Sequence, residues 1–298
     1  MWRVSWIFAA IVCAAALAFP AEAARRVALV IGNAAYVNTP VLANPRNDAT
    51  DFGAAIKRFG FEVIEGFDLD KSGMDGKLRE FAEKLEGAAV AVFFYAGHGL
   101  QVDGINYLVP IDAKLSKKAA LEFEMVRLDS IQRHMESAER TSVLFFDACR
   151  DNPLARNLAA TMGTRSVREG AGLAQQEAGA GTLISYSTAP GRTALDGEGR
   201  NSPYTSALVQ QMLSSGDHLA EMLYEVRNSV MKTTNGGQVP WDVSALTRRF
   251  YFKEPAQQPP VVAALPPDTI PQAPTATDIT PRASGETDFP PLEPLVPL

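Results

Sequence analysis

The sequence contains few of the residues that hold metal ions. Its 298 residues include two cysteines and three histidines. No cluster of these residues has the ligand spacing of a zinc site. The sequence therefore predicts no metal site, and no cofactor is expected.

An excess of positive charge is also absent. The formal net charge is −6 at pH 7, so nothing favours a polyanion and no nucleic-acid partner is expected. The sequence contains no repeat of fixed period, which argues against a repeat architecture. The hydrophobic fraction of 46% is ordinary for a globular protein. The length suits one sizeable domain with appendages, or two small domains.

Long apolar runs are missing except at the N-terminus. Arg3 is followed by an apolar run over residues 4–19, then by Pro20 and the small-x-small tripeptide of residues 21–23. These are the three parts of a secretory signal peptide, and the run is shorter than the roughly 20 residues of a bilayer span. We expect residues 1–23 to be removed and the protein to be periplasmic or secreted, with no remaining membrane span. A retained N-terminal anchor is the alternative.

Removal of the signal peptide leaves one cysteine in the mature chain. Cys13 lies in the apolar run and is lost with it, so Cys149 cannot form an internal disulfide. A single thiol in an exported protein is either reactive or available to pair with another chain. The alternative is a small buried apolar residue.

Apolar runs without alternation, separated by helical stretches, predict an α/β fold. A mostly parallel sheet flanked by helices is expected, with all strand carboxyl ends at one edge, where ligands bind in such sheets. Asp103-Gly104 predicts a hairpin. The expected strands are residues 25–31, 61–67, 88–95, 141–147, 182–187 and 249–252.

Two regions lack the pattern of packed elements. Residues 151–180 are rich in alanine, glycine and arginine and are expected to form a flexible linker. Residues 254–298 are rich in proline and are expected to form a disordered tail. The folded domain is therefore predicted to cover residues 24–253.

His98 and Cys149 each follow a buried run of the sequence. If the two strands are neighbours, both side chains reach the same edge of the sheet. A cysteine peptidase needs such a pair, because the thiolate attacks the carbonyl carbon and the imidazole transfers the proton. The alternatives are a hydrogen-bonded histidine at a strand end and a cysteine of the core. His134 and His218 are expected on the surface, away from this edge.

Glycines flank His98 on both sides. Gly97 and Gly99 have no side chain to obstruct a substrate backbone. The backbone N–H groups of Gly99 and Cys149 are predicted to form an oxyanion hole.

Three segments resemble the motifs of the caspase, metacaspase and paracaspase group. Tyr95–Gly99 resembles the histidine motif, Phe146–Arg150 the cysteine motif, and Ser185–Gly191 the strand and loop that line the substrate groove. The similarity covers roughly residues 26–252 with the motifs in the family order. It implies a three-layer caspase–haemoglobinase-like fold and cysteine endopeptidase activity on peptide or protein substrates.

The differences from caspases concern the pocket for the residue before the cut bond. Asp147 stands where caspases carry glutamine, and Asp151 replaces a glycine. Metacaspases have an aspartate at the first position and another in an Asn-Asp pair, which this chain matches at Asn47-Asp48. By resemblance, Asp48 and Asp147 line an acidic pocket for arginine or lysine. The alternatives are a carboxylate at a helix N-terminus for Asp48 and a local capping residue for Asp147.

The resemblance also implies how the substrate binds. Ser187 is expected to belong to an edge strand that pairs with an extended peptide; the alternative is an ordinary loop.

The linker over 151–180 resembles the caspase inter-subunit linker, which suggests self-cleavage at Arg156, Arg165 or Arg168. No acidic cluster matches the calcium site of some metacaspases, so calcium dependence is not predicted. The alternative function is an inactive scaffold that binds peptides or proteins. The sequence leaves open whether the protein forms a homodimer.

Overall fold

The computed structural model describes residues 24–149, 173–190, 192 and 194–253. The chain divides into two compact units, Met1–Pro255 and Ala256–Leu298, and the second unit lies outside the described residues. All of the described helices and strands belong to the first unit.

An eight-stranded sheet forms the centre of the fold: six strands follow the order β2-β1-β3-β6-β7-β8, and outside this path β4 pairs with β3 and with β5. The first five of these strands run parallel, and β8 pairs antiparallel with β7. The strands are β1 (Arg26–Gly32), β2 (Glu62–Phe67), β3 (Val90–Val102), β4 (Ile105–Leu108), β5 (Val126–Arg127), β6 (Thr141–Cys149), β7 (Thr182–Tyr186) and β8 (Trp241–Ser244).

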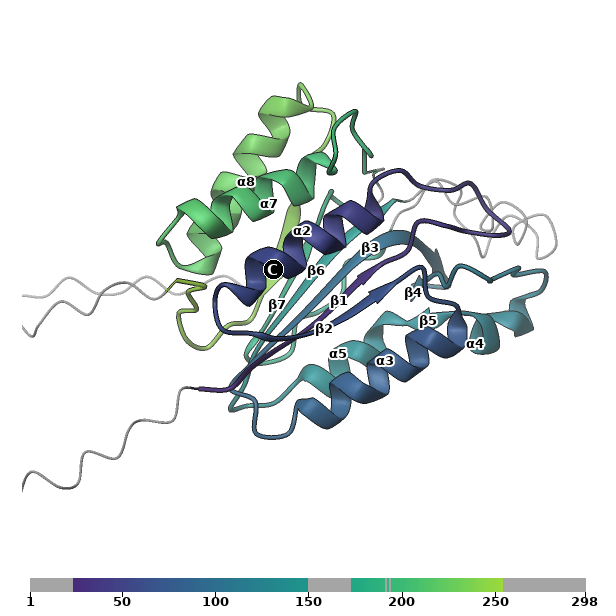
Figure 1. Cartoon of the computed structure of the whole chain (residues 1–298), viewed down its shortest axis with the longest axis horizontal. Coiled ribbons are helices and arrows are strands. Elements are labelled where there is room, and N and C mark those ends of the chain that lie inside the picture. The colour runs from purple at the N-terminus through teal and green to yellow at the C-terminus, as the bar shows by residue number, and fades with distance from the viewer. Residues whose placement is uncertain (1–23, 150–172, 191, 193, 254–298) are drawn as a thin grey trace, which may run out of the picture. The chain divides into compact units, whose positions relative to one another are not determined.

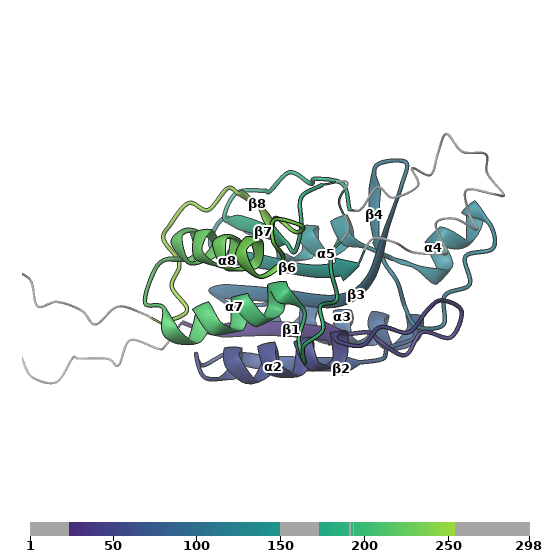
Figure 2. The ribbon, with the colours of Figure 1, turned by 90° about the horizontal axis from the view of Figure 1, so that it is seen from above.

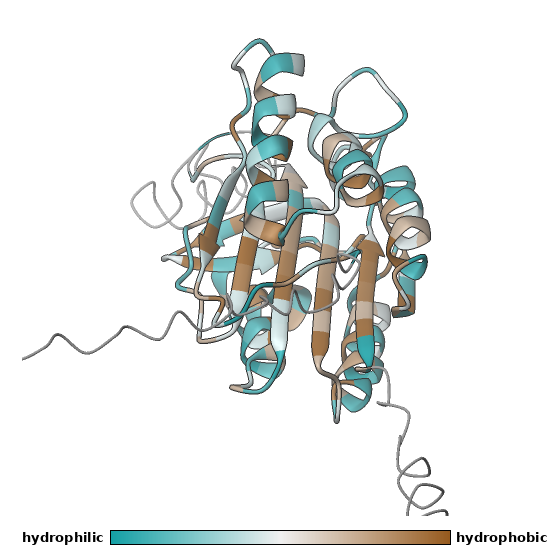
Figure 3. Ribbon diagram, turned by 90° about the vertical axis from the view of Figure 1, so that its left-hand side faces the viewer, coloured by the Kyte–Doolittle hydropathy of each residue, from teal (hydrophilic) through white to brown (hydrophobic). Residues whose placement is uncertain are grey.

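The helices form a layer on each face of this sheet. Helices α2, α7 and α8 cover one face, and α3 and α5 cover the other (Figures 1 and 2). The strands between the two layers are strongly hydrophobic, as Figure 3 shows, so both faces of the sheet must be covered. The helices are α2 (Pro45–Lys57), α3 (Lys71–Lys84), α4 (Leu121–Glu124), α5 (Leu128–Met135), α7 (Pro203–Ser214) and α8 (Leu219–Thr233), with a 3₁₀ turn at Lys118–Ala120.

Side-chain alternation divides the strand residues between these layers. On β3, Phe94 packs with α2 and α7, whereas Phe93 packs with α3 and α5. Parallel strands covered on both faces need apolar residues at every position, which explains the unbroken apolar runs of the sequence. The expected three-layer α/β fold is therefore confirmed.

The strand order reverses beside β1, which pairs with β2 on one side and β3 on the other. Crevices at such a point are the usual ligand sites of open α/β sheets. The loop that leaves β1 here carries Tyr36 and Pro40 to the end of β3, where both contact His98.

The hairpin predicted at Asp103-Gly104 is present. Both residues have positive φ, 50° and 82°, as the tightest hairpin turns require. Strand β3 continues beyond the parallel sheet to reach this turn, and its last residues, from Gly99 on, pair with β4.

The prediction of a strand at residues 249–252 is wrong. Phe250 and Phe252 are buried, but their carbonyls accept hydrogen bonds from the Leu219 amide and the Arg26 guanidinium instead of from a strand partner. The last strand is β8. Its short, polar and partly exposed sequence carries no strand pattern.

Several predicted segments lie outside the described residues. They are the signal peptide of residues 1–23, most of the linker and the proline-rich tail. The end of the linker is described, and it is attached to the domain: Leu173 is buried, and the Asn106 side chain bonds both the N–H and the C=O of Ala174. Among the described residues, no helix combines the length and the apolarity of a membrane span.

Candidate active site

Strands β3 and β6 bring the proposed catalytic residues to adjacent positions. The two strands are parallel neighbours, and their register ends with His98 as the partner of Cys149. Register partners on neighbouring strands have adjacent backbones. The sequence suggested that each residue follows its strand; instead both lie within the strands. The sheet ladder, and not a loop, therefore sets the spacing of the two backbones.

The His98 ring is held by the loop that follows β1. Its centroid lies 4.4 Å from that of the Tyr36 ring, and Nε2 lies 3.0 Å from the Pro40 carbonyl oxygen. A carbonyl only accepts hydrogen bonds, so Nε2 carries the proton in this contact. In the neutral ring Nδ1 is then the nitrogen that accepts a proton.

Two tyrosine hydroxyls hold the backbone of His98. The Tyr36 hydroxyl accepts a hydrogen bond from the His98 N–H at 2.7 Å, and the Tyr95 hydroxyl donates to the His98 carbonyl at 2.8 Å. The two hydroxyl oxygens lie 3.3 Å apart. Tyr36 was not identified from the sequence, because it lies in a loop without a recognisable motif.

The same tyrosines explain the glycine before His98. A Cβ atom at Gly97 would lie 2.6 Å from the Tyr36 hydroxyl oxygen and 2.8 Å from that of Tyr95. The φ of Gly97 is +153°, which side-chain-bearing residues rarely adopt. Gly97 therefore makes room for protein groups, whereas the sequence suggested room for substrate.

Gly99 meets the chain that returns from the linker. A Cβ there would lie 3.1 Å from Leu173 Cδ2 and 3.3 Å from Ala148 Cβ. In the hairpin, Gly99 is the register partner of Leu108. The oxyanion hole formed by the N–H groups of Gly99 and Cys149 stays a prediction.

The two aspartates of the expected acidic pocket meet at one serine. Asp48 lies in the first turn of α2, and Asp147 lies on β6, two residues before Cys149. Both are buried, with 2% and 6% of their surface exposed. The Ser202 N–H donates to Asp48 Oδ1 at 3.0 Å, and the Ser202 hydroxyl donates to Asp147 Oδ2. The Thr205 hydroxyl also donates to Asp147 Oδ2, at 2.7 Å.

Burial changes the ionisation of both carboxyl groups. Loss of solvation, and then the neighbouring charge of Asp147, raise the pKa of Asp48 to about 8. Burial also raises the pKa of Asp147, although hydrogen bonds from Ser202, Thr205 and Ser187 oppose the shift. At neutral pH the protonated form of the Asp48 carboxyl group is therefore favoured.

The loop before Ser202 is attached along one side of α2. The Asn47 amide donates to the Arg200 carbonyl at 3.1 Å, and the Asn44 amide donates to the Asp196 carbonyl. The Arg200 guanidinium binds both oxygens of Asp51 at 2.9 and 3.0 Å. Residues 196–202 are thus held against the helix that carries Asp48.

Ser187 directly follows the last residue of β7. Strand β7 pairs with β6 on one side and with β8 on the other. Both pairings extend to Tyr186, so β7 is an inner strand up to that residue. The Ser187 N–H donates to the Phe146 carbonyl at 2.8 Å, and its own carbonyl accepts from Gln238 at 2.7 Å. Ser187 itself lies beyond the β7–β8 pairing, so its expected role in pairing with a peptide stays a prediction; its hydroxyl also bonds Asp147.

The remaining histidines lie elsewhere, as expected. His134 is exposed on α5 and its Nδ1 donates to the Ser130 carbonyl at 2.7 Å. His218 precedes α8. In the described part of the chain, no group of histidine, cysteine and acidic residues could hold a metal ion.

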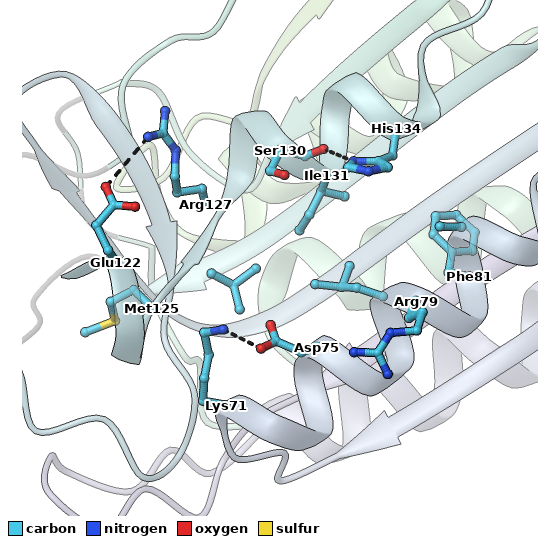
Figure 4. A pocket seen from close by; sticks show the side chains of 13 residues that line it. Lys71, Asp75, Arg79, Phe81, Glu122, Met125, Arg127, Ser130, Ile131 and His134 are labelled. Carbon is cyan, nitrogen blue, oxygen red and sulfur yellow. Dashed lines mark hydrogen bonds and ion pairs between the residues drawn. The ribbon is translucent and has the colours of Figure 1, made fainter. Parts of the chain in front are cut away.

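A separate pocket lies between α3 and α5, with a volume of about 440 Å³. Figure 4 shows the Lys71–Asp75 and Arg127–Glu122 ion pairs at its rim, with Phe81 and Ile131 among its apolar walls. These helices cover the face of the sheet opposite α2, so this pocket is distinct from the Asp48–Asp147 pair.

Two comparisons with known proteins show the family of the chain. The family model for the caspase domain matches residues 25–251. The mucosa-associated lymphoid tissue lymphoma translocation protein 1 of Homo sapiens and its homologue from Mus musculus are each 29% identical to this chain over 126 residues. The matched segment is 42% of this chain but spans 15% of the length of each relative. The chain belongs to the caspase-domain family of peptidases.

Proposed function

We propose that the protein is a cysteine endopeptidase with Cys149 as nucleophile and His98 as acid–base partner. The observation that carries the proposal is the register of β3 and β6, in which the two residues are direct partners. The hydrogen bond from Nε2 to the Pro40 carbonyl supports the role of His98, because it leaves Nδ1 to accept the thiol proton.

The reaction then has two stages. The Cys149 sulfur attacks the peptide carbonyl, and its proton moves to His98, which passes it to the leaving amine as the C–N bond breaks. Water hydrolyses the resulting thioester and regenerates the thiol. The N–H groups of Gly99 and Cys149 are proposed to stabilise the oxyanion, where loss of one donor typically costs about 10²–10³ in rate.

We propose that Asp48 and Asp147 select arginine or lysine before the cut bond. Their positions also fit the structural alternatives, since Asp48 lies in a first helical turn and Asp147 accepts from groups at the start of α7. Those roles do not require two carboxyl groups to be buried together. Such burial is unfavourable, because it opposes the ionisation of both groups. A bound guanidinium would compensate the negative charge of the two carboxylates and donate hydrogen bonds to both.

We also propose self-cleavage within residues 150–172. Both ends of this segment lie at the candidate site, because it follows Cys149 and returns at Leu173, which packs beside Gly99. Arg156, Arg165 and Arg168, the predicted sites, lie outside the described residues. Cleavage in the same molecule needs only that one of them reaches the site from these ends.

A peptide panel tests the main proposal. Fluorogenic peptides that end in Arg, Lys or Asp are incubated with the wild type, Cys149→Ala and His98→Ala. We expect turnover of Arg and Lys peptides by the wild type alone. Turnover of Asp peptides only would overturn the pocket assignment. Binding of Arg peptides without turnover by any of the proteins would favour the peptide-binding scaffold.

Export is proposed from residues 1–23, which lie outside the described part of the chain. N-terminal sequencing of protein from the periplasmic or culture fraction should begin at Ala24. Recovery of the full-length chain in membranes would instead support a retained anchor.

A further inference from the structure

We propose that Ser202 is the positioning residue of the acidic pocket, holding Asp48 and Asp147 at a spacing that favours a guanidinium over an ammonium group. This inference rests on the proposed specificity for basic residues and adds a group that selects between them. Ser202 lies outside the three segments that resemble the family motifs.

Ser202 connects α2, β6 and α7, the three elements that would form the proposed pocket. Its N–H binds the carboxyl group on α2, and its hydroxyl binds the carboxyl group on β6. The hydroxyl oxygen also accepts from the Thr205 N–H at 2.9 Å, which makes Ser202 the N-cap of α7. Ser202 itself is 3% exposed. One residue therefore holds both aspartates relative to the same helix end, Asp48 through its backbone N–H and Asp147 through its hydroxyl.

The first turns of α7, which follow Ser202, are anchored in the core. Tyr204 is fully buried and its hydroxyl lies 2.7 Å from that of Ser185 on β7. Leu208, one turn later, is also fully buried in the core. Ser202 cannot move far without displacing these residues.

The chain before Ser202 is held just as closely. The Asn47 amide binds the Arg200 carbonyl, and the Arg200 guanidinium binds Asp51. Asn47 and Asp51 lie four residues apart on α2 and so on one side of the helix, and Asp48 neighbours Asp51 because the two lie three residues apart. The backbone N–H of Ser202 is thereby directed at Asp48.

The two basic side chains differ in what they require of such a pocket. A guanidinium is planar and presents its N–H groups in a rigid fork, so it needs acceptors at a set spacing. An ammonium is a compact charge on a flexible stem and tolerates a change in spacing. Loss of the Ser202 hydroxyl should therefore weaken arginine binding more than lysine binding.

Substitutions that separate the hydroxyl from the helix cap test this role. Ser202→Ala removes the hydroxyl but keeps the N–H, and Ser202→Thr keeps both. Ser202→Gly also removes the hydroxyl while retaining an acceptable N-cap, in case the alanine variant folds poorly. Asp70→Ala is the matched control, because Asp70 caps α3 by accepting from the Gly73 N–H at 2.7 Å, away from the pocket.

The readout is kcat and KM for two peptides that differ only in Arg or Lys before the cut bond. We expect Ser202→Ala or Ser202→Gly to raise KM for the Arg peptide about tenfold, with kcat within about threefold, because Asp147 is no longer held in place to bind the guanidinium. KM for the Lys peptide should change less than about threefold. Ser202→Thr should restore the Arg preference, and Asp70→Ala should leave it unchanged.

Dissociation constants of the same peptides with Ser202 variants in the Cys149→Ala background give a second readout that needs no activity. Equal losses for Arg and Lys, or the same loss in Asp70→Ala, would overturn the role of Ser202 while the peptidase proposal stands. A wild type that neither cleaves nor binds either peptide would overturn the proposed specificity, and the role of Ser202 with it.

Discussion

At the scale of single residues, a few hydrogen bonds hold His98, the proposed base, in position. Tyr36 contributes twice, because its ring packs on the imidazole and its hydroxyl accepts from the His98 N–H. The sequence could predict His98 from its motif but not Tyr36, whose contact depends on how the loop after β1 folds back. A residue without a local pattern is visible only in the tertiary structure.

Tyr36→Phe keeps the ring but removes the hydroxyl. We expect unfolding free energy to fall by about 1–3 kcal/mol, because the buried His98 N–H loses this acceptor. We expect kcat to fall on the order of tenfold or more, because the base shifts. Thermal denaturation and peptide kinetics measure both effects. Tyr224→Phe, at a tyrosine that is 52% exposed, should change neither; unchanged kcat in Tyr36→Phe would contradict the role given to the hydroxyl.

The ionisation of Asp48 should make arginine binding depend on pH. The Asp48 pKa is raised to about 8, so the carboxyl is mostly neutral below that pH and charged above it. A guanidinium binds the charged form, and affinity should therefore rise about tenfold or more between pH 6.5 and 9. Titration of Cys149→Ala with an Arg peptide avoids effects of the thiol.

The control for this titration is Asp48→Asn in the same background. Its side chain stays neutral at every pH, so its affinity should be weak and should lose most of the rise. If the two proteins show the same pH profile, Asp48 does not bind the guanidinium.

At the scale of elements, α2 supports the site twice. It carries Asp48, and it holds the loop of residues 196–202 through Asn47 and Asp51. The apolar face of this helix packs in the core, where Phe52 and Ile56 are buried. Its polar contacts were not predictable, because their partners lie about 150 residues later in the chain.

Arg200→Ala tests whether these contacts matter to the pocket. The ion pair with Asp51 is partly exposed, so we expect stability to change by less than about 1 kcal/mol. KM for Arg peptides should rise about threefold to tenfold, because the loop must be ordered when substrate binds. Arg133→Ala, which breaks an ion pair with Asp129 on α5, is the control. Equal KM values in both variants would show that the loop needs no such attachment.

At the scale of the whole molecule, the sequence predicted the parallel sheet and the meeting of two distant motifs. Unbroken apolar runs identified β1, β3 and β6, and the strand-end rule placed His98 and Cys149 together. The same reasoning failed at β8, whose short polar sequence resembles a loop. The pairing of β7 with β8 was not predictable either, because it depends on the chain after α8.

The return of the linker to the site leads to a prediction for the intact chain. Leu173 packs beside Gly99, so residues 150–172 begin and end near the proposed dyad. Mass spectrometry of the purified wild type should show cleavage after Arg156, Arg165 or Arg168. Cys149→Ala should stay intact, and identical masses for the two proteins would refute self-cleavage.

Alkylation of Cys149 tests the proposed dyad most directly, because it requires no substrate. A chain that begins at Ala24 contains this cysteine alone, so the rate of reaction with iodoacetamide reports on one thiol. At pH 7 we expect the wild type and His134→Ala to react about tenfold faster than His98→Ala, because the imidazole activates the thiol. Equal rates in all three proteins would contradict the pairing of His98 with Cys149.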